Sequence, residues 1–235
     1  MEKIYTGKTK DVFKHSQEKL MFYFKDEVTG ENGVIDPGAN SVLGQISGKG
    51  RMSLELSQYY FNLLEKNSVP THFIKAIPAE GYMEVKNARP PGEHLSPTGG
   101  LEFICRLKAY GSFVKRYQKY VKEELQELPY LVEITLKDDE KGDPLINDDA
   151  IVALDILSEN QLFQGKQYTR QASKVIAHDL EQKGLSLLDI KFEFGLYGND
   201  VILIDEVSAD AMRVMDQSQK ILSHQEIYQQ VLETS

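Results

Sequence analysis

Short apolar stretches separated by glycines and charged residues mark the start of the chain. Apolar positions at 4–5, 12–13 and 20–24 form brief runs, and the glycines at 7, 30 and 33 interrupt them. Such runs are typical of short strands joined by tight turns. We therefore predict an antiparallel meander over roughly the first 40 residues.

A helical pattern replaces these short runs after residue 50. Leucines and tyrosines recur at near-helical spacing over 54–64. Ser53 is placed to cap the start of the helix, and Asn67 and Pro70 are placed to stop it. This spacing predicts one amphipathic helix with a buried apolar face.

The chain then returns to extended patterns and reaches a break. The segments 71–77 and 82–86 are expected to be strands, and prolines and glycines crowd the stretch 78–100. We place the domain boundary near residue 86. The expected domains are 1–86, rich in β-structure, and 87–235, which mixes helices and strands.

The second part of the chain supports an α+β fold class. Strands are predicted at 101–107 and 130–136, a polar loop at 137–149, and a helix at 159–183 that ends at Gly184. The other expected elements are a short helix capped by Ser112, a helix capped by Asp148 or Asp149, a hairpin of 187–194 and 201–206 that turns around Gly195 and Gly198-Asn199, and an amphipathic helix in the last 20 residues.

Composition excludes several classes of protein. Acidic residues number 36 and basic residues 27, a formal net charge of −9, whereas nucleic-acid binding needs a basic surface. A single cysteine, Cys105, excludes a disulfide scaffold and favours a reducing, cytoplasmic location. The apolar runs are far shorter than the ~18 residues of a membrane span, and no signal-peptide core follows Met1. We expect neither a nucleic-acid nor a membrane partner.

Two basic segments stand out against this acidic background. Gly7-Lys8-Thr9-Lys10 lies between two predicted strands, where a glycine turn brings backbone N–H groups and two ammonium groups toward a phosphate. Arg106 ends a strand, and Gly111-Ser112 opens a helix that carries Lys115 and Arg116, which together make an anion site. The alternatives are an exposed lysine-rich turn and a solvated basic helix.

The predicted C-terminal hairpin carries the most informative charges. Alternation places Asp189, Lys191 and Glu193 on one face of a strand, and the return strand ends in Asp205-Glu206. Carboxylates from neighbouring strands that converge in this way suit Mg²⁺ together with phosphate oxygens. The register of the hairpin decides between Asp205 and Glu206. The alternative is a polar sheet face with cross-strand Lys–Glu pairs.

These motifs resemble the SAICAR synthetase family of purine biosynthesis over essentially the whole chain. The strongest is Asp189-Ile190-Lys191-Phe192-Glu193-Phe194-Gly195, similar to the family's D-x-K-x-E-F-G signature. Support comes from Gly7 to Lys10, from Asp143 to Asn147 (D-P-L-I-N), and from Asp205 to Asp210 followed by Arg213 and Asp216. One motif departs from the family: R-N-x-x-A-G-S reads Arg106 to Ser112 here, with Leu107 and Tyr110 at the changed positions.

The resemblance implies an ATP-dependent ligase. Its reaction joins the carboxylate of carboxyaminoimidazole ribonucleotide (CAIR) to the amine of L-aspartate through an acyl phosphate, in a cleft between the two domains of a cytoplasmic homodimer. The implied residues are Gly7, Lys8, Thr9, Lys10 and Lys86 for ATP; Glu193 and Asp205 for Mg²⁺; Arg106, Ser112, Asp210 and Arg213 for CAIR; Lys191, Lys10 and Asp189 for catalysis; and Lys115 and the 143–148 loop as candidates for aspartate.

Two other functions fit the same residues. A small-molecule kinase would use sheet-bound lysines and two magnesium carboxylates equally well. A non-catalytic nucleotide-binding module would use the charged hairpin as structure only. The products separate the three, since a kinase leaves phosphate on its acceptor, a ligase releases it, and a binding module forms no product.

Overall fold

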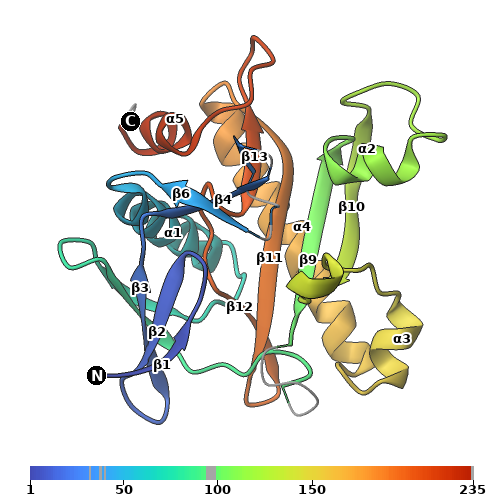
Figure 1. Cartoon of the computed structure of the whole chain (residues 1–235). Helices are drawn as coiled ribbons and strands as arrows, with labels where there is room; N and C mark the ends of the chain where they lie inside the picture. Colours follow the sequence, from blue (N-terminus) through green and yellow to red (C-terminus); the bar gives the residue numbers. More distant parts are fainter. Residues whose placement is uncertain (32, 37–38, 40, 94–98, 234–235) are drawn as a thin grey trace.

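Two five-stranded antiparallel sheets organise the chain (Figure 1). The structure is a computed structural model and describes residues 1–31, 33–36, 39, 41–93 and 99–233. The first sheet has the order β1-β2-β3-β8-β7. Its strands are β1 (Glu2–Thr6), β2 (Lys10–Lys14), β3 (Lys19–Phe24), β7 (Phe73–Ile77) and β8 (Tyr82–Lys86). The predicted N-terminal meander and both predicted extended segments are therefore confirmed.

The second sheet has the order β10-β9-β11-β12, with β13 also paired to β11. In Figure 1 the long orange strand β11 runs through the centre of the molecule, and α4 lies behind it. The strands are β9 (Leu101–Lys108), β10 (Glu127–Leu136), β11 (Ser186–Tyr197), β12 (Asp200–Ile204) and β13 (Met212–Met215). Because β11 pairs with three other strands, its side chains can meet residues from distant parts of the chain.

The remaining elements cover the sheets or connect them. Helix α1 (Lys49–Lys66) buries Leu54, Phe61 and Leu64, and α4 (Glu159–Gln182) buries Ala172 and Ile176, so their apolar faces join one hydrophobic core. The other elements are β4 (Glu27–Glu31), β5 (Val34–Ile35) and β6 (Val42–Gln45) in a third, small sheet, and α2 (Ser112–Tyr117), η1 (Asp139–Lys141), α3 (Asp148–Ala153), α5 (His224–Tyr228) and η2 (Gln229–Glu233).

The two large sheets meet along one edge. Thr71, just before β7, forms a parallel bridge with Leu203 in β12. The amide of His72 donates to the Leu203 carbonyl at 2.9 Å, and the Leu203 amide donates to the Pro70 carbonyl at 2.8 Å. This junction holds the charged face of β11 opposite the turn between β1 and β2.

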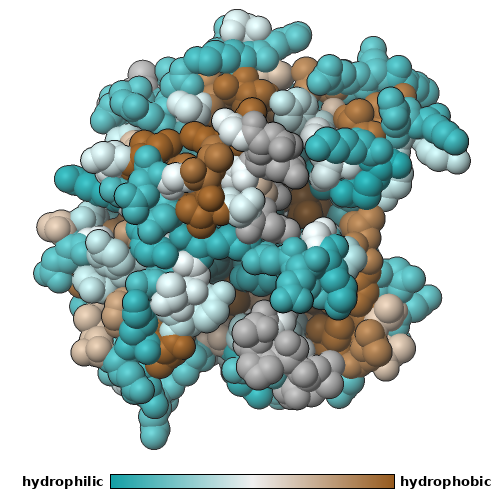
Figure 2. All heavy atoms as spheres, viewed as in Figure 1, coloured by the Kyte–Doolittle hydropathy of each residue, from teal (hydrophilic) through white to brown (hydrophobic). Residues whose placement is uncertain are grey.

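Exposed apolar side chains gather on the small sheet. Val34, Ile35, Val42 and Leu43 are each at least 40% exposed, and Figure 2 shows a hydrophobic area in this region of the surface. In the part of the chain that the structure describes, no helix is long and apolar enough to cross a membrane.

Three predicted helix starts are wrong. Helix α1 begins at Lys49 and follows Gly48, whose φ of 79° favours glycine. Ser53 lies inside this helix, and its hydroxyl donates to Asp210 and does not cap the helix. Helix α2 begins at Ser112 itself, after Gly111. Helix α3 is capped by Asn147, whose side chain accepts from the Ala150 amide, so neither predicted aspartate is the cap.

The hairpin turn and the last helix also differ from the prediction. Gly195 lies inside β11, opposite Ile202, and the turn falls at Gly198-Asn199. A Cβ on Gly195 would stand 3.1 Å from the Ala88 Cβ and 3.2 Å from the Arg89 carbonyl oxygen, so glycine serves close packing here. The C-terminal helix is shorter than predicted, starting at His224 with Ser223 as its cap. Part of the turn-rich stretch, 94–98, lies outside the described residues.

Candidate active site

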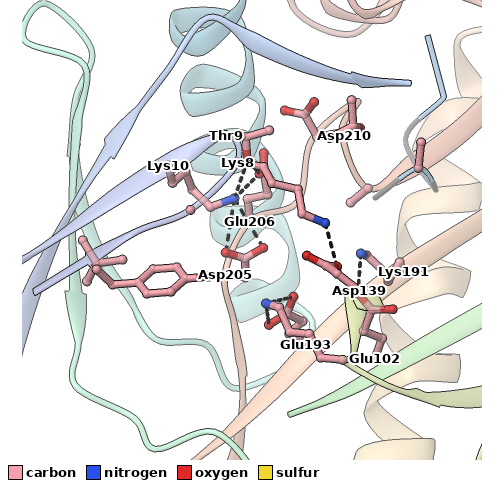
Figure 3. Close-up of a pocket in the computed structure, with 17 residues that line it drawn as sticks. Lys8, Thr9, Lys10, Glu102, Asp139, Lys191, Glu193, Asp205, Glu206 and Asp210 are labelled. Atoms are coloured by element: carbon pink, nitrogen blue, oxygen red, sulfur yellow. Dashed lines mark hydrogen bonds and ion pairs between the residues drawn. The ribbon is translucent and has the colours of Figure 1, made fainter. Parts of the chain in front are cut away.

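A charged cavity lies between the turn after β1 and the open face of the second sheet (Figure 3). The turn contributes Gly7, Lys8, Thr9 and Lys10. Strands β9 and β11, the segment that runs from the end of β10 into η1, and the segment after β12 supply the other charged residues, namely Glu102, Lys137, Asp139, Lys191, Glu193, Asp205, Glu206 and Asp210. Eight of the predicted site residues are thus brought together around one space.

Lys10 is the most enclosed lysine of this cavity, with 8% of its surface exposed. Its ammonium group donates to Asp205 Oδ2 at 3.3 Å and to Glu206 Oε1. Burial alone would lower the pKa of Lys10, but the charges of Asp205 and Glu206 outweigh it and raise that pKa. Lys10 therefore stays cationic at any physiological pH.

Asp205 and Glu206 have different environments although they are neighbours. Asp205 has a φ of 67°, and its carbonyl oxygen lies 3.2 Å from His72 Nε2. Burial opposes ionisation of Asp205, but Lys10 and other lysines outweigh it and lower its pKa. Burial raises the pKa of Glu206 despite the adjacent ammonium group. The sequence left open whether Asp205 or Glu206 faces the site. In the structure, both carboxylates line the cavity.

The alternation predicted for β11 is confirmed. Lys191 Nζ donates to Glu102 Oε1 at 2.6 Å across the β9–β11 pair (Figure 3). Lys137 Nζ donates to both carboxylate oxygens of Glu193, at 2.7 and 2.9 Å. Burial alone would lower the pKa of Lys191, but the charges of Glu102 and Glu193 outweigh burial and raise that pKa. Cross-strand Lys–Glu pairing is thus present, and these pairs line a cavity.

The mouth of the cavity is bridged by one more ion pair. Lys8 Nζ lies 2.8 Å from Asp139 Oδ1, which connects the turn after β1 to η1 in the other half of the chain. Both side chains are partly exposed, 33% and 49%, so this contact adds little to stability. A phosphate that entered the mouth could replace the Asp139 carboxylate on Lys8.

A second charged cluster surrounds Asp189 on the same face of β11. Arg106 is 2% exposed and donates to Glu133 at 2.6 Å, to Asp189 at 3.2 Å and to the Ser112 hydroxyl at 3.1 Å. Arg213 donates from NH1 to both Asp189 oxygens, at 3.0 and 2.9 Å. Arg106, Ser112 and Arg213 are thus brought together, with Asp189 bridging the two arginines.

Asp210 lies between the cavity and the C-terminal helix. Its carboxylate accepts from the Ser53 hydroxyl at 2.9 Å, contacts Lys49 Nζ, and lies 3.0 Å from His224 Nε2. Lys49 is only 1% exposed. Burial would raise the pKa of Asp210, but its bond with His224 and the charge of Lys49 outweigh burial and lower it.

Other predicted residues serve other contacts. Lys86 does not line the cavity, and its ammonium group donates to the Thr71 carbonyl at 3.0 Å. Lys115 lines the hollow beside Arg213. In the 143–148 loop, Asp143 accepts from the Asp138 amide and Asp148 pairs with Lys166. Cys105 is buried as predicted, and burial raises its thiol pKa to about 11.

Sequence reasoning missed the partners of the predicted residues. Glu102 could have been found, because strand alternation places it on the same face of β9 as Arg106. The others come from loops or distant elements, where the sequence carries no comparable signal. The missed residues are Asp36, Lys49, Glu133, Lys137, Asp139 and His224.

The family model of SAICAR synthetase matches residues 3–232. The chain belongs to the SAICAR synthetase family. Its relatives include the phosphoribosylaminoimidazole-succinocarboxamide synthase of Clostridium tetani, 46% identical over 215 residues that cover 91% of this chain and 92% of that protein. The synthase of Pyrobaculum calidifontis is 35% identical over 215 residues, 92% of this chain and 82% of that protein.

Solved structures agree with the SAICAR synthetase assignment. A SAICAR synthetase in complex with ADP superposes with a TM-score of 0.83 at 28% identity, covering 97% of both chains. The enzyme of Ehrlichia chaffeensis gives a TM-score of 0.82 at 26% identity, over 96% of this chain and 90% of that chain. The resemblance inferred from the motifs and the predicted α+β fold are confirmed, and the protein is a ligase.

Proposed function

We propose that the protein joins the carboxylate of CAIR to the amine of L-aspartate while ATP is converted to ADP and phosphate. The observation that carries the proposal is the shared face of β11, where Asp189 holds the arginine cluster and Lys191 and Glu193 line the lysine-rich cavity. Four residues of strand span about 13 Å. A ribonucleotide with a phosphate at one end and a carboxylate at the other suits that spacing.

The ATP phosphates are assigned to the turn after β1. Lys8 and Lys10 would neutralise phosphate charge, and Thr9 would approach with its backbone N–H group. Gly7, whose own amide donates to the Lys10 carbonyl at 2.7 Å, would shape the turn. Support comes from their places in the cavity and from the raised pKa of Lys10. Lys86 is proposed near the nucleotide on the resemblance alone.

Mg²⁺ fits the residues of this cavity. Six carboxylates and four lysines are found among its described lining residues, so the lining carries two net negative charges. No three metal-ligating side chains converge among the described residues. Mg²⁺ commonly takes one or two carboxylates and completes its shell with phosphate oxygens and water. Glu193 and Asp205 would hold it. The bound ion would offset charge that develops on the transferring phosphoryl group.

The CAIR phosphate is assigned to the arginine cluster. Arg213 and Ser112 would contact it, and the buried Arg106 would act through its bond to Ser112. Asp189 orients Arg213 by accepting two bonds from one guanidinium nitrogen. Asp210, which lines the cavity beside this cluster, is proposed to contact the polar part of the ribonucleotide.

The chemistry requires activation of a carboxylate. A carboxylate oxygen of CAIR attacks the γ-phosphorus of ATP, and ADP leaves with the electrons of the broken P–O bond. The aspartate amine then attacks the acyl carbon of this acyl phosphate, inorganic phosphate leaves, and the nitrogen loses a proton. Lys191, a charged ammonium group, would neutralise the phosphoryl group or the substrate carboxylate, because phosphoryl transfer depends on position and charge.

Three further features belong to the proposal. Residues 1–86 and 87–235 are proposed as the two domains, supported by the fact that each large sheet lies entirely within one of these ranges. The protein is proposed to be a homodimer. A cytoplasmic location is proposed because the one cysteine is a buried free thiol.

The test is ADP release by the purified protein with Mg-ATP, CAIR and L-aspartate, each omitted in turn. We expect release that requires all three, with the succinocarboxamide product detected by mass. Release that ignores aspartate and leaves phosphate on an acceptor would establish the kinase instead. ATP binding without any turnover would establish the binding module.

A further inference from the structure

The guanidinium group of Arg213 already carries an anion on the side that faces solvent. Its NH2 group donates to Asp36 Oδ1 at 2.6 Å, although the two residues are 177 positions apart in sequence. Asp36 follows β5 in the N-terminal part of the chain. This contact brings a carboxylate to the place where the arginine cluster opens to solvent.

Asp36 is one of three carboxylates that pair with the arginines of this cluster. Three arginines, at 106, 116 and 213, meet three carboxylates, Glu133, Asp189 and Asp36. The side chains of Glu133 and Asp189 are 6% and 5% exposed, whereas that of Asp36 is 43% exposed. Asp36 is therefore the carboxylate of this set that is most readily exchanged for an anion from solution.

Asp189 and Tyr110 contact the Arg213 guanidinium group away from Asp36. Its NH1 group is held by Asp189, and the Tyr110 ring lies over it at 6.0 Å. The backbone of Gly111 is close enough that a Cβ there would stand 3.7 Å from the Arg213 Cζ. Arg213, Tyr110, Gly111 and Asp36 line one hollow together with Lys115. An anion that enters this hollow meets Arg213 on the side where Asp36 is bound.

We propose that Asp36 is an internal competitor for the substrate phosphate at Arg213 and thereby a specificity-determining residue. The inference rests on the proposed function, because it takes the phosphate of the ribonucleotide as the incoming anion. A phosphate ester dianion carries more charge than a carboxylate and presents three oxygens, so it displaces Asp36. A monoanion gains less from the exchange and is disfavoured. Asp36 therefore lowers the affinity for every anion and selects for phosphorylated ligands.

The test is calorimetric binding of inorganic phosphate and of ribose 5-phosphate to wild-type protein and to Asp36→Asn, without ATP. We expect the variant to bind both about two- to fivefold more tightly, the range for loss of one partly exposed ion pair. In turnover, the KM for CAIR should fall by a similar factor while the KM for ATP stays unchanged. Equal or weaker phosphate binding by Asp36→Asn would overturn the proposal.

Two further variants assign the effect to the Asp36–Arg213 contact. Glu55→Gln removes a carboxylate that pairs with Arg51 at 2.8 Å on helix α1, and it should leave phosphate binding unchanged. In an Arg213→Gln background, Asp36→Asn should no longer increase affinity, as a double-mutant cycle requires. If the side-chain amide introduced by Asp36→Asn forms a new contact, Asp36→Ser provides a second measurement without that amide. Thermal unfolding checks that each variant is folded.

Binding and turnover keep the two proposals separate. If ADP release proves independent of aspartate, the proposed function fails, yet the ribose 5-phosphate titrations still decide the role of Asp36. If the ligase activity is established and Asp36→Asn binds phosphate no more tightly, the competitor role alone is wrong.

Discussion

Replacing Glu193 with glutamine separates the proposed catalytic role of this carboxylate from its role as an ion-pair partner. The substitution keeps the size of the side chain and removes its charge. In the structure, Glu193 is 15% exposed and receives two hydrogen bonds from Lys137, which is 37% exposed. Loss of a pair as accessible as this costs about 1 kcal/mol of stability or less. We therefore expect a folded variant with a small decrease in melting temperature.

The expected loss of activity is much larger than the loss of stability. Removing one preorganised electrostatic contact to a charge that develops in the transition state lowers kcat by about 100- to 1,000-fold. That factor corresponds to about 2.7–4 kcal/mol of transition-state stabilisation. The assay is ADP release at saturating substrates over a range of Mg²⁺ concentrations, with thermal unfolding measured in parallel.

Two control variants sharpen this experiment. Glu127→Gln removes an exposed carboxylate that pairs with Lys108 outside the cavity, and it should change neither kcat nor the Mg²⁺ dependence. Lys137→Met frees both oxygens of Glu193 and should lower the Mg²⁺ concentration needed for half-maximal activity. Turnover by Glu193→Gln within about threefold of wild type, with an unchanged Mg²⁺ dependence, would refute the electrostatic role assigned to Glu193.

Three further predictions concern stability and substrate affinity. Burial lowers the pKa of His72 in the folded protein to about 3, whereas an unfolded histidine has a pKa of about 6.5. Between these two pH values only the unfolded chain protonates this histidine, so the free energy of unfolding should fall by about 1.4 kcal/mol for each pH unit from pH 6.5 toward pH 3. Urea unfolding should show that the free energy of unfolding decreases less between pH 7 and pH 5 for His72→Asn than for wild type. An equal decrease in both proteins would contradict the reasoning. Lys49→Met leaves the buried Asp210 without its ammonium partner and should cost about 3–5 kcal/mol in urea unfolding, and a loss below about 1 kcal/mol would show that Lys49 is dispensable. Tyr110→Ala removes the ring over Arg213 and should raise the KM for CAIR about two- to fivefold with kcat unchanged, whereas Tyr110→Phe should match wild type.

Local patterns predicted most of the strands and the longest helix. The helix expected at 159–183 is α4, Glu159–Gln182, and its periodic apolar residues are the ones that pack on the sheet. The alternation of β11 also placed Asp189, Lys191 and Glu193 on one face, because strand periodicity is a property of the backbone. Predictions of this kind need no knowledge of the partner elements.

The failures arose where a tertiary contact overrides a local preference. Ser53 has the chemistry of a helix cap, but its hydroxyl bonds Asp210, and the helix extends back to Lys49, which meets the same carboxylate. Gly195 has the chemistry of a turn, but it lies in a strand where residues 88–89 pack closely against its Cα. In both cases the deciding partner is more than 100 residues away in the sequence.

The site itself was predicted by residue type, and its pairing was not. Lys10 pairs with Asp205 and Glu206, and Lys191 pairs with Glu102, so each cation meets carboxylates from another strand or segment. These pairs keep the lysines charged in a partly buried cavity. They also mean that anionic ligands must exchange with carboxylates already in place. Affinity for phosphate in this protein is therefore a difference between two sets of ion pairs, which a list of basic residues along the sequence does not contain.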